Sequence, residues 1–560
     1  MEYLKRECKR EGRRVEELKN RVKVLNERLN VVVENEWKKK NMRWKVQEMS
    51  NVVWVYAVLE YEMNERVKNV MEQGLDEMFQ RKRQELSGET VSIVMWSFKT
   101  MKYRPSDEFM KKWMRISLEF LNKSSPQSLT HSIYAYVSVI VPNVLRNGGG
   151  NPVEEYLERW LVAFRLNMGA FQCAELTTTL YSLGKLRWMC EKGGYSCGDG
   201  EVLMDLMDGF FGMHEECVQH ELYAMLLVRI DEFNEMKAFV NVFYGMAKLK
   251  FNVTESIFNE MWTKFERMVK NSSGISMNEV SSVILSLSEM DSVVKNEVLM
   301  VKSKMKVLEK VVDVKMVEES EGELRNGLNV VNSLCGMIRI GYHPSVKTVN
   351  EWMIDVGMED EKVLVRVLWS VVKILTHLRV GECEEVKKME KNLNDVCETL
   401  NGLDGMRNWE VCELSMVMWA LEKVGDGVVE CGDELLKKCA REVERRFCEK
   451  DKRLDGQCVS MMIWSVGRRK MRMLEGGINE NGTVKMWMKM LEEYGRGMNL
   501  IEWWNVLKVC VFFEIQFPQQ VMEVCSKVVE WGISGGASQI QRANELKLMM
   551  QLVHVNQDAE

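Results

Sequence analysis

Seven basic residues recur at one position of a repeated pattern and could contact phosphate groups. Each lies four residues after a bulky residue, here called the anchor, and this place is called the basic position. They are Lys185, Lys248, Arg339, Lys373, Lys423, Arg468 and Lys508. Equivalent positions line up when similar helical units stack, so these side chains would form a positive track that binds a nucleic-acid backbone. The place also falls in the last turn of a helix, where the helix dipole favours a cation by roughly 0.3–1 kcal/mol, so capping explains the pattern equally well.

A second position, three residues before the anchor and here called the variable position, carries side chains that differ and are often polar. Its members are Ile93, His131, Thr178, Asn241, Ser282, Asn332, Arg366, Met416 and Met461. A variable polar position inside a constant apolar frame is what repeat proteins need to recognise one RNA base per unit. We therefore take His131, Asn241, Asn332 and Arg366 as candidate RNA-binding residues. The alternative is ordinary packing or hydrogen bonding between helices, which the Ile and the two Met at this position favour.

Motifs for catalysis and for metal binding are missing from the sequence. It contains no Gly-rich phosphate loop, no His-Glu-x-x-His, no paired Cys-x-x-Cys and no nucleophile elbow. His214, Cys217 and His220 are spaced by three residues, which places the two histidines on different faces of a helix, away from a shared metal ion. Adjacent carboxylates such as Glu215 and Glu216 are typical of solvated helix faces. We expect no enzyme activity, no cofactor and no metal.

An internal repeat indicates which elements position these residues. Leu334–Ser345 aligns without a gap on Met95–Ser106. Each copy begins in an apolar helical run, has a small residue after the anchor, and ends in an aromatic residue, a basic residue, Pro and Ser. Pro is favoured in the first turn of a helix and disrupts a helix interior, so this ending stops one helix and starts the next. The repeated unit is therefore predicted to be helix-turn-helix.

Candidate anchors occur throughout the chain. They are Tyr56, Trp96, Tyr134, Tyr181, Tyr244, Leu285, Cys335, Trp369, Trp419, Trp464 and Trp504. The next residue, here called the small position, is Gly, Ala or Ser after ten of the eleven anchors, which allows close helix approach, whereas the large anchor is expected to fill the space between hairpins. Apolar residues five before and one before the anchor are expected to form one buried face. We predict an all-α fold, an α-solenoid of about eleven degenerate helix-turn-helix repeats of roughly 38–50 residues.

Composition fits an all-α protein. The 560 residues include 6 Pro, where average usage of about 5% would give roughly 28. The 15 Cys are an odd number without paired motifs, which indicates reduced thiols in an intracellular compartment. No apolar run approaches the roughly 18 residues that span a bilayer, so we expect a soluble protein without membrane insertion. The net charge of −6 disfavours nucleic-acid binding unless basic residues gather locally.

Residues 1–48 are predicted to form a basic amphipathic helix. Its apolar seam alternates steps of three and four residues: Val15, Leu18, Val22, Leu25, Leu29 and Val32. The segment could be a helix that caps the first repeat, a coiled-coil or partner helix at residues 15–32, or a basic arm that contacts RNA phosphates or a ribosomal surface. It shows neither a secretory core nor the composition of a clear transit peptide.

The repeats are predicted over residues 49–531, and residues 532–560 are predicted to be a Gly-rich break and a short C-terminal helix. The long interval after Tyr181 is expected to hold an extra helix pair around Tyr223. Loops are expected at Gly148–Pro152, Glu191–Gly200 and Val317–Arg325.

Four segments of the sequence resemble the octotricopeptide repeat and the related helical repeats of organellar RAP-domain and FAST-kinase-like proteins. They are Ser125–Leu129 (Ser-Pro-Gln-Ser-Leu), Tyr181–Leu186 (Tyr-Ser-Leu-Gly-Lys-Leu), Ile340–Pro344 (Ile-Gly-Tyr-His-Pro) and Trp419–Gly425 (Trp-Ala-Leu-Glu-Lys-Val-Gly). In the first of them Ser is expected to cap a helix that Pro opens. The resemblance covers roughly residues 49–531 and is specific in the second, third and seventh copies. No RAP module is recognised after Trp531.

The resemblance implies an α-solenoid that binds RNA in mitochondria or chloroplasts. Such a protein governs transcript maturation, stability or translation, or holds ribosomal RNA as a subunit of an organellar ribosome. We therefore expect organellar RNA, mRNA or rRNA, as the partner, with mitoribosomal or other organellar proteins beside it. The mitochondrion is the expected localisation and the chloroplast the alternative. A protein-protein interaction scaffold without direct RNA contact is the alternative function.

Overall fold

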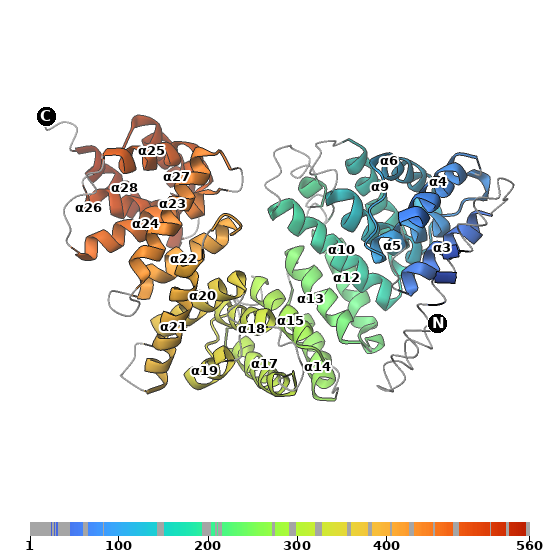
Figure 1. Ribbon diagram of the computed structural model, residues 1–560, viewed down its shortest axis with the longest axis horizontal. Helices are drawn as coiled ribbons and strands as arrows, with labels where there is room; N and C mark the ends of the chain where they lie inside the picture. The colour runs from blue at the N-terminus through green and yellow to red at the C-terminus, as the bar shows by residue number, and fades with distance from the viewer. Residues whose placement is uncertain are drawn as a thin grey trace. The chain divides into compact units, whose positions relative to one another are not determined.

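The computed structural model of the chain is helical wherever regular structure is assigned. It describes residues 24, 27–28, 30–31, 45–59, 65–81, 83–142, 151–192, 203–207, 210, 215–233, 235–251, 253–271, 275–290, 298–319, 327–354, 360–378, 384–403, 406–424, 431–451, 454–473, 481–513, 515, 517–533 and 537–555. Among these residues no strand is assigned, and Figure 1 shows coiled ribbons alone.

Two compact units make up the chain, and each is a stack of helix hairpins. Unit 1 comprises Met1–Ser273 with Glu289–Lys295, and unit 2 comprises Gly274–Ser288 with Asn296–Glu560. Within each unit, first helices of successive hairpins pack against each other in chain order, and second helices form a second layer behind them. Sequential packing of this kind defines an α-solenoid. The predicted fold class is therefore confirmed.

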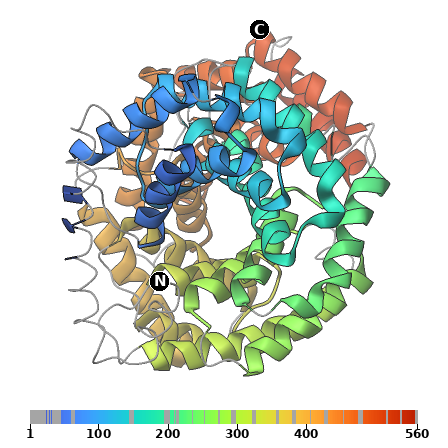
Figure 2. The ribbon, with the colours of Figure 1, turned by 90° about the vertical axis from the view of Figure 1, so that its right-hand side faces the viewer.

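Unit 1 contains the first five anchors, each in the first helix of a hairpin. These helices are α3 (Val46–Val58), α5 (Gly88–Thr100), α7 (Pro126–Ala135), α10 (Cys173–Lys192) and α13 (Met236–Lys248). The second helices are α4 (Glu65–Arg81), α6 (Asp107–Phe120), α9 (Asn151–Asn167), α12 (Glu215–Val228) and α14 (Glu255–Asn271). Shorter pieces are the 3-10 turns η1 (Arg83–Glu85), η2 (Leu121–Lys123), η4 (Met168–Ala170) and η5 (Ile230–Glu232), and the π-helical turn η3 (Tyr136–Ile140) that continues α7. Figure 2 shows these hairpins in chain order, coloured from blue to green.

Unit 2 contains the remaining six anchors, again in first helices. These are α15 (Met277–Glu289, except its last residue), α18 (Gly327–Arg339), α20 (Glu361–Leu378), α22 (Val411–Val424), α24 (Gly456–Met473) and α26 (Leu500–Phe512). The second helices are α17 (Val298–Glu319), α19 (Val346–Ile354), α21 (Glu384–Gly402), α23 (Gly432–Cys448), α25 (Asn481–Tyr494), which continues into η6 (Gly495–Gly497), and α27 (Gln519–Ile533). The last helix, α28 (Ala537–Val555), packs against α26 and α27 and so extends the first-helix layer.

Serine side chains begin the helices that the sequence motif predicts. Ser125 Oγ accepts a hydrogen bond from the backbone N–H of Ser128 at 3.2 Å, with Pro126 in the first turn of α7, as expected. Ser106 and Ser345 cap α6 and α19 in the same way. The prolines of these two motifs therefore precede the cap, because helix α6 begins at Asp107 and α19 at Val346.

The first helices end in a recurrent left-handed turn. The second residue after the helix has a positive φ in three copies: Lys102 (55°), Lys250 (56°) and Gly341 (80°). In each copy the next backbone N–H bonds back to a carbonyl five residues earlier, as from Tyr342 to Met337 at 2.9 Å. This is a Schellman-type helix end, which reverses the chain without leaving the last carbonyls unpaired.

The buried face expected on the first helices is present. Leu364 and Leu368 of α20 lie five residues before and one residue before the anchor, and neither is more than 1% exposed. Some second helices bind this face through a tryptophan. The indole N–H of Trp113 in α6 donates to the carbonyl oxygen of Val91 in α5 at 2.7 Å. The largest fully buried side chains include Trp113, Trp160, Trp409, Trp487 and Trp503, none of which is an anchor.

The small position allows the close helix contacts that the sequence predicts. A Cβ atom added to Gly245 in α13 would lie 2.7 Å from the carbonyl oxygen of Leu180 in α10. In unit 2 a Cβ atom on Gly336 would lie 2.7 Å from Cγ2 of Ile284 and 3.1 Å from its carbonyl oxygen. In both pairs the small residue packs on the residue that precedes the neighbouring anchor, so one packing geometry recurs in both units.

Around Tyr223 the described residues contain helix α12 and a helical piece at residues 203–207, and the rest of the helix pair expected there lies outside the described residues. Helix α10 packs directly on α13, and α12 packs on α14 in the second-helix layer. One expectation about an intervening segment is partly wrong. The segment from Val317 is not entirely a loop, because α17 continues to Glu319. The rest of that stretch, residues 320–325, lies outside the described residues, as do 148–150 and 193–200 of the other expected loops.

Little of the N-terminal segment is described. Every member of the seam predicted between residues 15 and 32 lies outside the described residues. Asn30 is described, and its Oδ1 accepts a hydrogen bond from the hydroxyl of the first anchor, Tyr56, at 2.7 Å. Across the part of the chain that the structure describes, no helix combines the length and the apolar character needed to cross a bilayer.

Candidate nucleic-acid interface

Eight of the eleven anchors are only half-buried, which corrects the expectation that the anchors fill the space between hairpins. They are Trp96, Tyr134, Tyr181, Tyr244, Leu285, Trp369, Trp419 and Trp504. Tyr56, Cys335 and Trp464 are buried, as the sequence predicts. The variable position is half-buried in every copy named above, and the basic position is half-buried or exposed. Anchor, variable position and basic position therefore share the outward side of the first-helix layer, here called the anchor face. Steps of three and four residues place all three on one helix face.

Neighbouring anchors lie close enough to touch. The ring centroids of Tyr181 and Tyr244 are 5.0 Å apart, and those of Trp369 and Trp419 are 6.1 Å apart. Both separations fall in the range of favourable aromatic pairs. Within each unit, the anchors of successive first helices thus form short aromatic ladders along the anchor face.

Cations lie over several of these rings. In unit 2, Nζ of Lys373 is 4.8 Å from the ring centroid of Trp419 on the next first helix, and Nζ of Lys508 is 3.4 Å from that of Trp504. The guanidinium of Arg468 lies 5.2 Å from the ring centroid of Trp464. In unit 1, Nζ of Lys248 is 5.8 Å from the Tyr244 centroid. Such contacts, roughly 0.5–2 kcal/mol each, hold the charge at the edge of the ladder.

In unit 2 the predicted basic positions lie beside one another. Burial lowers the pKa of Lys373, and the positive charge of Lys423 lowers it further. Burial likewise lowers the pKa of Lys508, with Arg468 as the next cause. Lys373 lies over a ring of α22, the helix of Lys423, and Glu422 contacts both Lys423 and Arg468. Lys373, Lys423, Arg468 and Lys508 therefore form a local positive track, in which neighbouring charges repel each other. Arg339 is exposed at the end of α18.

Unit 1 has a shorter basic stretch. Lys185 is half-buried, its pKa is lowered by burial, and its Nζ lies 3.5 Å from the hydroxyl of Ser138 at the basic position of the preceding helix. Lys248 packs against Gly184, the residue before Lys185, because a Cβ added to Gly184 would lie 3.2 Å from Cβ of Lys248. Lys248 forms an ion pair with Glu289.

Acidic side chains neutralise part of the basic stretch. In unit 2 the buried carboxylate of Glu422 lies 2.9 Å from Nζ of Lys423 and 3.7 Å from Nε of Arg468. In unit 1 Glu289 occupies the basic position itself and pairs with Lys248. Each unit therefore carries a positive segment with an acidic interruption.

Three of the nine residues at the variable position contact other helices. The imidazole of His131 lies 5.2 Å from the ring of Trp96, and burial lowers the pKa of His131 to about 4. Arg366 donates from its guanidinium to the side-chain oxygen of Asn332, the variable residue of the preceding first helix. Asn241 is half-buried on α13. His131, Asn332 and Arg366 thus already pack against or hydrogen-bond to other side chains of the protein. Contacts from these residues to an RNA base would compete with those interactions.

Sequence reasoning missed Lys99, which lies three residues after the anchor Trp96. Its Nζ contacts the hydroxyl of Tyr134 on the next first helix and lies 3.9 Å from that ring centroid. The signal was present, since basic residues also stand at 102 and 104 in the same motif. A search confined to the fourth residue after the anchor could not find it.

Among the described residues, no group of three His, Cys, Asp or Glu side chains could hold a metal ion. His214 lies outside them. Burial raises the pKa of several thiols, including that of Cys458 to about 12, so these side chains are structural apolar groups and poor nucleophiles. The expectation that the chain is not an enzyme stays a prediction.

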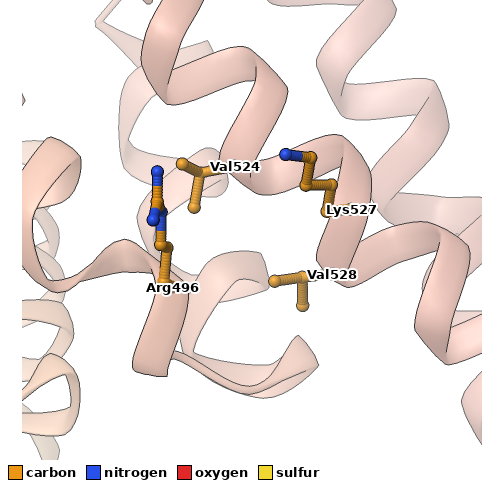
Figure 3. A pocket seen from close by; sticks show the side chains of 4 residues that line it. All are labelled: Arg496, Val524, Lys527 and Val528. Carbon is orange, nitrogen blue, oxygen red and sulfur yellow. The ribbon is translucent and has the colours of Figure 1, made fainter.

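A hollow of about 440 Å3 lies near the C-terminal end of unit 2. It is lined by Arg496 of η6 and by Val524, Lys527 and Val528 of α27 (Figure 3). The hollow is separate from the anchor face, because η6 and α27 belong to the second-helix layer.

The fold therefore places the chain in the class of all-helical repeat proteins. No family model matches the sequence, and no curated protein matches it. Among solved structures, a homology model of the full-length AP-3 complex in an intermediate open conformation is 11% identical over 95% of this chain and 92% of that chain, with a TM-score of 0.24. A circular tandem repeat protein with a novel repeat topology and enhanced subunit contact surfaces is 11% identical over 93% of this chain and 99% of that chain, with a TM-score of 0.18. At these TM-scores the likeness carries no argument about function.

Proposed function

We propose that this chain is a helical-repeat protein that binds single-stranded RNA on the anchor face. The observation that carries the proposal is the row of half-buried aromatic anchors with cations held over their rings. Proteins that bind single strands combine aromatic platforms for bases with a basic groove for the backbone. The anchor face offers both kinds of group within each unit.

Helix capping alone does not account for the cations. A cation that only stabilises its own helix dipole needs to lie near the last carbonyls of that helix. Lys373 instead lies over the ring of Trp419, and Lys99 over the ring of Tyr134, each on the following first helix. Each of these lysines links two successive hairpins of the same unit, along the path that a bound strand would follow.

The net charge of −6 is compatible with this proposal because affinity for RNA depends on local charge. Unit 2 gathers Lys373, Lys423, Arg468 and Lys508 on one helix layer, and Glu422 offsets part of that charge. Neutralised phosphates release counterions, which makes the binding depend on salt. We expect moderate affinity at physiological salt and little sequence selectivity, because three of the nine residues at the variable position contact other helices.

The cellular role rests on the octotricopeptide-like segments. We propose that the RNA is an organellar transcript or ribosomal RNA, in the mitochondrion or alternatively the chloroplast. Sedimentation of the tagged protein with and without intact organellar ribosomes separates a ribosomal subunit from a free maturation factor. A protein absent from the organelle would remove this part of the proposal.

Binding to a labelled single-stranded oligonucleotide tests the RNA proposal. The test variant combines Lys373→Glu, Lys423→Glu and Arg468→Glu. The control combines Lys388→Glu, Lys391→Glu and Lys437→Glu, three exposed lysines on the second helices α21 and α23. Both variants change the net charge by the same amount. A difference in RNA binding between them therefore reports the position of the charges and not the total charge.

We expect the test variant to bind at least about tenfold more weakly and its salt slope to fall by about 2, since each lost phosphate contact on a single strand contributes about 0.7. The control variant should stay within about threefold of the wild type. Circular dichroism verifies that both variants are folded. Equal losses in the two variants would refute binding on the anchor face.

A protein-protein scaffold is the second candidate. It is favoured by the acidic interruptions at Glu289 and Glu422 and by Ile501 and Phe512, which are 50% and 55% exposed on α26. Partners that co-purify after nuclease treatment would support this function, and partners lost on digestion would count against it.

A further inference from the structure

Unit 1 contains a hollow of about 310 Å3 whose walls are strongly basic. It is lined by Lys99, Lys102, Tyr103, Arg104, Ser138, Val139, Pro142 and Lys185. Four of these eight residues are cations and none carries a carboxylate, although the hydroxyl of Tyr103 donates to the carboxylate of Glu72 on α4. A concave surface with this lining is suited to an anion.

Three structural pieces bring the cations together. Lys99 comes from the last turn of α5, Lys102 and Arg104 from the turn that follows it, and Lys185 from α10. The wall between them is the π-helical turn η3, which holds Ser138 and Val139. Single π-helical turns within helices are rare and often accompany functional sites.

The charges in this hollow are only partly compensated. Burial and then the charges of Lys185 and Lys237 lower the pKa of Lys99 to about 8. Lys99 is held by the ring and hydroxyl of Tyr134, and Lys185 by the hydroxyl of Ser138, neither of which carries a negative charge. Arg104 reaches Asp107 at 3.7 Å, but both side chains are more than half exposed. An anion in the hollow would relieve the repulsion between the lysines.

We propose that this hollow binds a phosphomonoester dianion, the terminal phosphate of an RNA strand. The proposal rests on the function proposed above, since the hollow adjoins the anchor face at Lys99 and Lys185. A terminal phosphate carries close to two charges at neutral pH and three acceptor oxygens, whereas an internal phosphodiester carries one charge. Several cations on three sides suit the dianion better than the phosphodiester, because each of the three terminal oxygens can accept a charge-assisted hydrogen bond.

Helix capping offers a simpler explanation for Lys99 and Lys102, which lie at the end of α5. It does not explain Arg104, which lies four residues after the end of α5, nor Lys185 on another helix. Capping does not explain why cations from α5, from the turn after it and from α10 meet in one hollow.

The experiment measures binding of the full chain to three forms of one labelled oligouridine, with a 5′-phosphate, a 3′-phosphate or no terminal phosphate. Uridine 5′-monophosphate serves as a competitor, and its effect on the melting temperature of the protein is recorded. The test variant combines Lys99→Gln and Lys185→Gln. The control combines Lys373→Gln and Lys423→Gln on the anchor face of unit 2.

We expect about tenfold tighter binding of one phosphorylated form than of the unphosphorylated strand, and competition by the mononucleotide for that difference alone. The Lys99 and Lys185 variant should lose the preference. The control should weaken all three strands by the same factor and keep the preference.

Equal affinity of the wild type for all three strands would overturn the phosphate site and leave the proposed function standing. If no strand binds while the mononucleotide raises the melting temperature of the wild type but not of the variant, the proposed function fails and the hollow is a site for a small phosphorylated ligand. If neither the strands nor the mononucleotide bind, both proposals are overturned.

Discussion

What a side chain on the anchor face contributes depends more on its burial than on its residue type. Lys373 and Lys423 occupy the same repeat position, yet Lys373 is half-buried over Trp419 and Lys423 is exposed beside Glu422. Lys373 therefore contributes packing as well as charge, because the stem of a long cationic side chain covers apolar surface. Charge removal at the two positions will not have equal effects on stability.

His131 provides a prediction about pH. Its pKa is lowered to about 4 by burial, against about 6.5 for an unperturbed histidine. Between these values the unfolded chain binds the proton more readily than the folded chain. The stability of unit 1 should therefore be unaffected by this group above pH 6.5 and should fall as the pH drops towards 4, by up to about 1.4 kcal/mol per pH unit.

Urea unfolding of wild type and His131→Gln at pH 7, 6 and 5 measures this effect. The variant should lose less stability than the wild type between pH 6 and 5. Thr178→Ala, at the variable position of another copy, is the control and should follow the wild-type pH dependence. Parallel curves for wild type and His131→Gln would show that the imidazole is not held neutral by the fold.

The role of a single residue could be predicted from the sequence where its partners are its neighbours in the chain, and could not where they belong to another hairpin. The Ser125 cap follows from its own neighbours and was predicted correctly. Lys99 was missed because its partner Tyr134 belongs to the next hairpin, and the pairing requires the angle at which α5 and α7 pack. Hydrogen bonding between helices was the stated alternative for the variable position, but the pairing of Arg366 with Asn332 could not be predicted, for the same reason.

At the scale of helices, the small position sets how closely successive hairpins approach. Gly245 has no space for a side chain, since a Cβ would lie 2.7 Å from a backbone oxygen of α10. Backbone atoms cannot move aside as a flexible side chain can. Overpacking of this kind typically costs about 1–3 kcal/mol.

Gly245→Ala should therefore lower the free energy of unfolding by about 1–3 kcal/mol, measured by urea denaturation. Gly169→Ala, in the same unit, is the matched control, because a Cβ there meets nothing within 4 Å. It should change stability by less than about 0.5 kcal/mol. A neutral Gly245→Ala would mean that α10 and α13 can separate at little cost.

The helix pattern was largely predictable, whereas the outward face was not. Apolar spacing identified the buried positions, such as Leu364 and Leu368, because burial on one side of a helix imposes its period on the sequence. The anchors share that apolar character, so the sequence alone assigned them to the core. The fully buried tryptophans belong mainly to second helices, as Trp113 and Trp160 do, and cover the core in the place where the anchors were expected.

At the scale of the molecule, sequential stacking within each unit places residues from the same repeat position side by side on one surface. Unit 2 collects a positive track and unit 1 a basic hollow, although the whole chain is acidic. Neither property follows from total charge. Each unit is expected to bind RNA by itself, with phosphates supplying most of the affinity and aromatic stacking the rest.

Cross-linking tests the central claim most directly, that RNA lies on the anchor face. The full chain is irradiated with an oligonucleotide that contains 4-thiouridine, and the modified peptides are located by mass spectrometry. The account predicts adducts on first helices, at or beside anchors such as Trp369, Trp419 and Trp504, and their loss when Lys373, Lys423 and Arg468 are changed to Glu. Adducts confined to the second helices α21, α23 and α25 would contradict it.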